Sequence, residues 1–209
     1  AYDTNPECEN SNNLTRDYYK NIIRGKTKSW IDVYVLNKLG QISDGKPVYE
    51  SFVHSTHVAK GDLAIADGVP IFVGIDFGLT PACVFAQRLR GRWIVFDELV
   101  AEDMGIVRFS ELMKQHMAQY LPREFIIFGD PAGDQRVQTD ESTPFQILRG
   151  RGLNARPAPS NDVLLRLESV STVLNRMTDG ESGMIIDPKC NNLIKGFDGG
   201  YHYKRLQVS

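Results

Sequence analysis

Two aspartates, Asp76 and Asp130, each end an apolar segment just before a turn that contains glycine or proline. The first ends "IFVGID" and the second ends "EFIIFGD". Neighbouring carboxylates repel each other, and burial raises the cost of ionising them, so a cation that compensates the charge favours such a pair. Mg²⁺ and Mn²⁺ prefer carboxylate and water oxygens. The pair therefore predicts a site for two such ions, which could hold the attacking and leaving oxygens of a phosphodiester.

Other acids repeat this pattern less clearly. Glu98 ends a predicted strand and is expected at the surface or behind the site, and Asp97 beside it is expected to be solvated. Asp187 precedes Pro188 in "MIIDPKC", and Asp198 precedes two glycines in "GFDGGYHYK". A structural role is the commoner one for such residues. Either of the two could approach the site, and Asp198 is predicted to join Asp76 and Asp130 as a metal ligand.

Basic residues give no global signal, because the net charge is −2. A groove can still be locally positive, since binding depends on where the bases lie. Several arginines follow the second aspartate in sequence, and further bases come late: Arg136, Arg149, Arg151, Arg156, Lys204 and Arg205. Contacts to a phosphodiester backbone are predicted for Arg136, Lys204 and Arg205.

The elements that position the two aspartates follow from hydrophobic periodicity and turns. Three apolar runs joined by short turns predict an antiparallel meander over residues 71–100. An amphipathic helix over 105–120 leads to a fourth strand, which a right-handed crossover would place parallel beside the first. Asp76 and Asp130 would then lie side by side at the carboxyl edge. The prediction is an α/β protein with a mixed five-stranded sheet, the meander plus parallel strands, flanked by helices.

The first 68 residues do not form a core of their own and are predicted to be a connector, with residues 69–209 as the main domain. The composition, 42% hydrophobic and 24% charged, is typical of a folded globular chain. Cys8, Cys83 and Cys190 are far apart and predict reduced thiols. No apolar run approaches the roughly 18 residues of a membrane span, and no secretory leader is recognisable.

The segment "RGKTKS" at 24–29 contains part of a phosphate-binding loop. The full motif needs a glycine at position 20, which is Lys20, and a preceding strand where a helix is predicted. We therefore expect no ATPase motor in this chain.

Several blocks together resemble the C-terminal nuclease domain of the large terminase subunit of tailed bacteriophages: "VGIDFGLTPACVFAQR", "VFDELV", "IIFGDPAGDQR" with "TDEST" after it, and "GFDGGYHYKR". "YYKNIIRGKTKSWIDVYVLNKLG" and "DGKPVYESF" resemble the segment that joins the ATPase motor to that nuclease. The resemblance implies an RNase H-like fold and metal-dependent cleavage of concatemeric viral double-stranded DNA during packaging. Asp76 and Asp130 match the family's first two metal-binding acids.

The same resemblance implies partners and a location. The partners would be double-stranded DNA, the ATPase motor of the same polypeptide, the portal protein and the small terminase subunit, in the host cytoplasm and without a membrane. The chain departs from the family in one respect, because the family's third acid usually comes in a later helical motif that is not found before Ser209. Either the sequence is truncated, or Asp187 or Asp198 takes that role.

Other classes of protein fit the aspartates in part. A resolvase or integrase core uses the same acids, and a non-catalytic docking domain is a further alternative. "GIDFGLTPACV" also resembles the first phosphate loop of the actin and heat-shock-chaperone ATPases. Those proteins need a second, duplicated subdomain with another glycine-rich loop, and this chain has no such repeat, which disfavours the ATPase interpretation.

Overall fold

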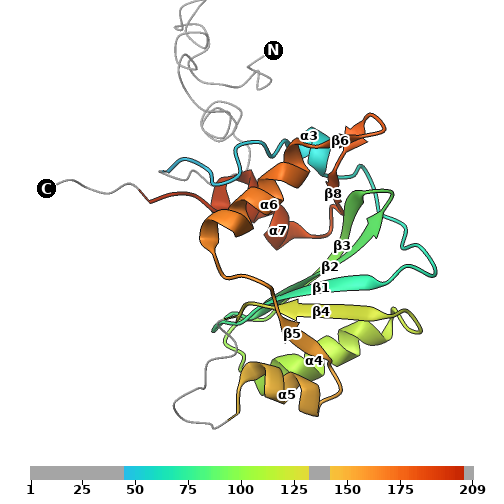
Figure 1. Ribbon diagram of the computed structural model, residues 1–209, viewed down its shortest axis with the longest axis vertical. Helices are drawn as coiled ribbons and strands as arrows, with labels where there is room; N and C mark the ends of the chain where they lie inside the picture. Colours follow the sequence, from blue (N-terminus) through green and yellow to red (C-terminus); the bar gives the residue numbers. More distant parts are fainter. Residues whose placement is uncertain (1–44, 132–141, 205–209) are drawn as a thin grey trace, which may run out of the picture. The chain divides into compact units, whose positions relative to one another are not determined.

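A mixed sheet of six strands organises residues 49–198, with the strand order β5-β4-β1-β2-β3-β8 (Figure 1). The structure, a computed structural model, describes residues 45–131 and 142–204. The strands of this sheet are β1 (Ile71–Asp76), β2 (Ala82–Leu89), β3 (Arg92–Val100), β4 (Phe125–Gly129), β5 (Ala155–Pro157) and β8 (Met184–Ile186). A separate two-stranded hairpin is formed by β6 (Met177–Thr178) and β7 (Glu181–Ser182).

The predicted meander and crossover are confirmed. Strands β1, β2 and β3 pair antiparallel in chain order, joined by short turns. Helix α4 (Ile106–Ala118) then carries the chain to β4, which pairs parallel with β1. Alternate residues of β1 face a buried core, so the strand has one buried and one accessible face.

The predicted strand count of five is wrong, because β8 is the sixth strand of the sheet. It pairs parallel with β3, from Trp93↔Met184 to Val95↔Ile186. Ile186 is fully buried, and its side chain belongs to the core on the second face of the sheet. The apolar run at 184–186 predicts a strand, but its partner depends on the long crossover from β5, which local spacing does not determine.

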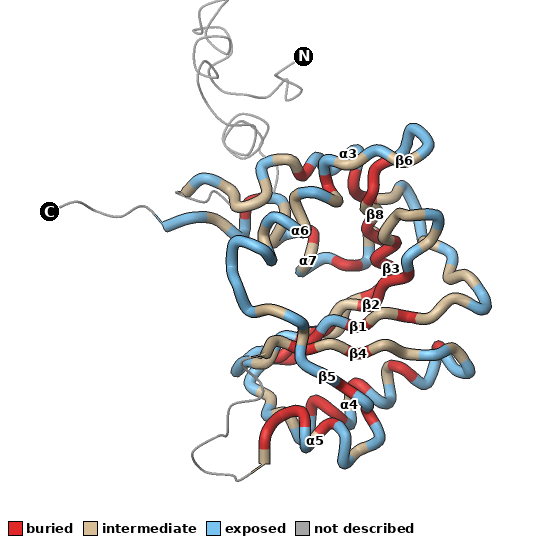
Figure 2. The backbone as a smooth tube through the Cα atoms, viewed as in Figure 1, coloured by how far each residue is buried: buried red, intermediate tan, exposed pale blue. Residues whose placement is uncertain are grey.

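Helices cover both faces of the sheet (Figure 1). Helices α4 and α5 (Pro144–Gly150) lie on one face, over a core that includes Ile71, Phe109 and Phe145. Helices α6 (Val163–Asn175) and α7 (Asn191–Lys195) lie on the other. Figure 2 shows the segment between β5 and α6 as mostly exposed. In the described part of the chain, no helix has the length and apolar character to cross a bilayer.

Two consecutive acids on β3 hold helices on opposite faces. The Asp97 carboxylate accepts hydrogen bonds from the Tyr120 hydroxyl and, at 2.6 Å, from Nε2 of His116 on α4. The Glu98 carboxylate accepts the backbone N–H groups of Asn192 and Leu193 at 2.8 Å each, at the start of α7. The prediction that Asp97 is solvated is wrong, because only 7% of this residue is exposed.

The segment before β1 packs on the sheet. Helix α3 (His54–His57) lies in it, and Phe52 and Val58 belong to the core beneath α6 and α7. The compact unit begins at Tyr49, whereas residues 45–48 and 199–204 belong to a second unit. Most of the predicted connector, residues 1–44, lies outside the described residues, so its linking role stays a prediction.

Replacing Gly129 with alanine is expected to destabilise the fold by about 1–3 kcal/mol. A Cβ at Gly129 would lie 2.6 Å from Phe77 Cε2, and Phe77 packs edge-on against the fully buried Phe145. The matched control is Gly74→Ala on β1, where a Cβ would meet only Val84 Cγ2, at 3.6 Å. Urea denaturation of both variants measures the difference. Equal losses would mean that the ring of Phe77 moves aside without cost.

Candidate active site

The two strand-end aspartates lie on adjacent strands at the carboxyl edge of the sheet. The parallel register of β1 and β4 ends at the pair Ile75↔Gly129, and the next residue on each strand is an aspartate. The Asp130 N–H donates to the Ile75 carbonyl at 3.2 Å, which continues the pairing by one bond. This is the placement that the crossover predicted. The adjacency does not test whether Asp76 and Asp130 bind a metal ion, so their role as ligands stays a prediction.

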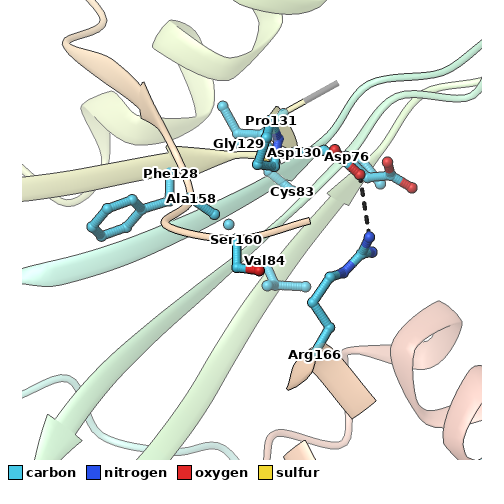
Figure 3. Close-up of a pocket in the computed structure, with 13 residues that line it drawn as sticks. Asp76, Cys83, Val84, Phe128, Gly129, Asp130, Pro131, Ala158, Ser160 and Arg166 are labelled. Carbon is cyan, nitrogen blue, oxygen red and sulfur yellow. Dashed lines mark ion pairs between the residues drawn. The ribbon is translucent and has the colours of Figure 1, made fainter. Parts of the chain in front are cut away.

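Both aspartates line a pocket of about 370 Å³. Its walls come from the ends of β1 and β4, from the start of β2 and from the segment that leads into α6 (Figure 3). Gly74, Val84 and Phe128 lie in it, on the face of the sheet opposite to α4 and α5. The pocket therefore opens on the face of the sheet opposite to α4 and α5, with the carboxylates at its rim.

Arg166 supplies a positive charge at this rim, and sequence reasoning missed it. Its guanidinium Nη1 lies 3.6 Å from Asp130 Oδ2 (Figure 3). The residue is on the first turns of α6, 36 positions after Asp130 in the sequence, and no motif marks it. Proximity in sequence pointed to other arginines. Of these, Arg149 donates to the Ala155 carbonyl and Arg151 pairs with Glu111, so both have structural partners.

Cys83 also lines the pocket but is not a ligand or a nucleophile at neutral pH. Its side chain is buried in the core beneath α4, and burial raises the pKa of the Cys83 thiol to about 12. The thiol is therefore protonated under ordinary conditions. Cys190 is likewise a buried free thiol, and burial raises its pKa to about 12. Free thiols are as predicted at both positions, and Cys8 lies outside the described residues.

The other two predicted acidic ligands, Asp187 and Asp198, do not line this pocket. Asp198 is exposed in the short π-helix η3 (Gly196–Gly200) and is not among the residues that line the pocket. Asp187 is buried and accepts the N–H groups of Leu63 and Lys189 at 2.7 and 3.0 Å, which is a structural role. Over residues 45–131 and 142–204, no cluster of three or more metal-ligating side chains exists. Asp198 as third ligand stays a prediction without support from this geometry.

None of the three predicted DNA-contacting bases is placed relative to this pocket. Arg136 and Arg205 lie outside the described residues. Lys204 is exposed and belongs to the second unit, with residues 199–204. Their roles stay predictions.

The donor groups at the rim fit a hard divalent cation. Both are carboxylates, the oxygen ligands that Mg²⁺ and Mn²⁺ prefer, and no imidazole or thiolate of the described residues joins them. The rim is open to solvent, so water can complete the coordination, as is usual for Mg²⁺. The two carboxylates are therefore compatible with such an ion.

Comparison with known proteins gives structural matches only. No protein-family model and no curated protein sequence matches the chain. The large terminase of a thermophilic bacteriophage, in complex with ATP-γ-S, superposes with a TM-score of 0.62 at 17% identity, over 92% of this chain and 46% of that chain. The P22 large terminase nuclease domain superposes with a TM-score of 0.58 at 12% identity, over 76% and 80% of the two chains.

A third match is the large terminase nuclease from the thermophilic phage G20c with bound magnesium, with a TM-score of 0.54 at 9% identity, over 79% of this chain and 85% of that chain. A G20c structure with bound cobalt matches with a TM-score of 0.52. The chain has the fold of these nuclease domains, the RNase H-like arrangement expected from the sequence. It spans less than half of the large terminase chain that was solved with ATP-γ-S.

Proposed function

We propose that this chain is a metal-dependent endonuclease that cleaves double-stranded DNA during the packaging of a tailed-phage genome. The observation that carries the proposal is the meeting of Asp76 and Asp130 at the rim of one pocket, on adjacent parallel strands. The structural similarity to large terminase nuclease domains, two of which were solved with bound magnesium or cobalt, supports it.

The proposed division of labour follows from the donor groups. Asp76 and Asp130 would hold Mg²⁺ or Mn²⁺, two ions in the full mechanism, through their carboxylate oxygens. Ions bound there supply activation of a water molecule and neutralisation of the charge on the leaving oxygen. The backbone bond from Asp130 to Ile75 fixes the distance between the two strands, so the carboxylates are positioned before any ion arrives. The accessible face of the pocket leaves room for a phosphodiester.

The proposed contacts with DNA and with other proteins rest on the sequence resemblance and not on the geometry of the pocket. Arg136, Lys204 and Arg205 are proposed to contact the DNA backbone, with Asp198 as a candidate further ligand. Residues 1–68 are proposed to link the nuclease to an ATPase motor of the same polypeptide. Portal protein and small terminase subunit are the proposed partners in the host cytoplasm. The ATP analogue in one matched structure agrees with a motor in that protein.

Supercoiled plasmid is expected to be cut by this chain in millimolar Mn²⁺, more slowly in Mg²⁺, and not in EDTA. Agarose gels over a time course measure the conversion to open-circular and linear forms. ATP is expected to have no effect beyond the Mg²⁺ that it carries. Cleavage that persists in EDTA, or plasmid left intact in both metals, would contradict the proposal. An increase in melting temperature specific to ATP would favour a nucleotide-binding protein instead.

A further inference from the structure

Arg166 is the one cationic side chain, among the residues that the structure describes, that lines the pocket with the two aspartates. Besides its 3.6 Å contact with Asp130 Oδ2, its Nη1 donates to Asn161 Oδ1 at 2.9 Å. The Arg166 side chain is 54% exposed and that of Asp130 is 21% exposed. An ion pair this long and this accessible contributes little to stability. Arg166 can therefore exchange Asp130 for another anion at small cost.

The backbone that carries Arg166 is tied to the same strand as Asp130. The Ala158 N–H donates to the Gly129 carbonyl at 2.9 Å, which anchors the segment leading into α6 beside the end of β4. The Asp162 side chain then caps α6 by accepting the Leu165 N–H at 3.0 Å. The backbone of Arg166 is thus held next to the aspartates, while its long side chain is 54% exposed and can turn toward a second partner at the rim.

We propose that Arg166 is a phosphate-binding residue that pairs with Asp130 only until a divalent ion and DNA arrive. This inference rests on the proposed nuclease function and adds a residue to it. A divalent cation on Asp130 repels the guanidinium, while a phosphodiester at the rim offers it negatively charged oxygens. The planar guanidinium presents its donors as a fork that matches phosphate geometry, so Arg166 binds a non-bridging oxygen of the phosphodiester that is cut.

The proposal predicts different effects on metal binding and on cleavage. Arg166→Gln removes a cation that competes for Asp130, so Mn²⁺ binding without DNA is expected to be unchanged or severalfold tighter. The same substitution removes a donor to the phosphate, so plasmid cleavage is expected to fall on the order of 10²-fold. Arg166→Lys keeps the positive charge but lacks the paired donors of the guanidinium, so it is expected to cut faster than Arg166→Gln and more slowly than wild type. If Arg166 merely held Asp130 in place, its removal would weaken both Mn²⁺ binding and plasmid cleavage.

The experiment uses the 209-residue chain. Electron paramagnetic resonance titration measures Mn²⁺ binding, and plasmid gels measure cleavage. Arg108→Gln is the matched control, because Arg108 is an exposed arginine on α4, across the sheet, and both measurements should match wild type. Wild-type cleavage by Arg166→Gln, or a parallel loss of Mn²⁺ affinity, overturns this inference and leaves the nuclease function standing. Wild-type protein that binds no Mn²⁺ and cuts no plasmid overturns both.

Discussion

Asp76→Asn and Asp130→Asn are each expected to reduce Mn²⁺-dependent plasmid cleavage on the order of 10³-fold or more while the fold stays intact. Asparagine keeps the size of the side chain but replaces an anionic oxygen donor with a neutral amide, which is a much weaker ligand for a hard divalent cation. In the absence of metal, Asp76→Asn is expected to leave the melting temperature unchanged or slightly higher, because it removes repulsion between neighbouring carboxylates.

Asp67→Asn is the matched control for both substitutions. Asp67 is an exposed aspartate just before β1, at the opposite edge of the sheet from Asp76, and it pairs with Arg123. Its replacement should leave cleavage at the wild-type rate. Circular dichroism checks that each variant is folded. Wild-type rates for Asp76→Asn and Asp130→Asn would remove these residues from the reaction, even if the chain is a nuclease.

Asp97→Ala is expected to cost about 2–4 kcal/mol of unfolding free energy, which lowers the melting temperature by roughly 5–15 °C. The substitution leaves the Tyr120 hydroxyl and the His116 ring without their acceptor. Tyr120 is buried, and burial together with the hydrogen bond to Asp97 raises its pKa, so it stays a neutral donor. Without the Asp97 carboxylate, the buried Tyr120 hydroxyl has neither that acceptor nor water to bond, which destabilises the folded state.

Glu111→Ala provides the comparison, because Glu111 is also an acid paired with a basic residue. It forms a 3.1 Å ion pair with Arg151 at the surface, and such pairs contribute about 0–1 kcal/mol. Urea denaturation of the two variants separates a buried acid from an exposed one. A loss for Asp97→Ala no larger than that for Glu111→Ala would show that the Asp97 contacts do not hold α4 to β3.

The adjacency of Asp76 and Asp130 could be predicted from the sequence because it depends on local signals and one rule of handedness. Each strand has a clear apolar run, the helix between them is strongly amphipathic, and right-handed crossovers leave one arrangement. Side chains at the ends of adjacent parallel strands must then meet. The resemblance to terminase nucleases and the solved structures agree on the same fold.

The features that sequence reasoning missed depend on long-range packing. Strand β8 has only three residues, and its place beside β3 is settled by the crossover through α6. Arg166 reaches the pocket because the segment after β5 forms a hydrogen bond with the end of β4, and the hydrophobic periodicity of the sequence does not predict that bond. Asp97 was predicted to be solvated because the sequence around it contains no residue that could pair with a buried acid. Its partners His116 and Tyr120 come from α4 and the residues after it, which pack on β3 only in the folded chain.

The measurement that tests the central claim most directly is a crystal soaked in millimolar MnCl₂, with diffraction data collected at the manganese absorption edge. We expect an anomalous peak within coordination distance of the carboxylate oxygens of both Asp76 and Asp130, about 2.0–2.1 Å if the ion sits as Mg²⁺ would. The same soak of Asp76→Asn crystals should lose or strongly weaken that peak. The assignment would be contradicted if the protein needs Mn²⁺ or Mg²⁺ to cut DNA but the crystals show manganese elsewhere and no anomalous density between the two aspartates.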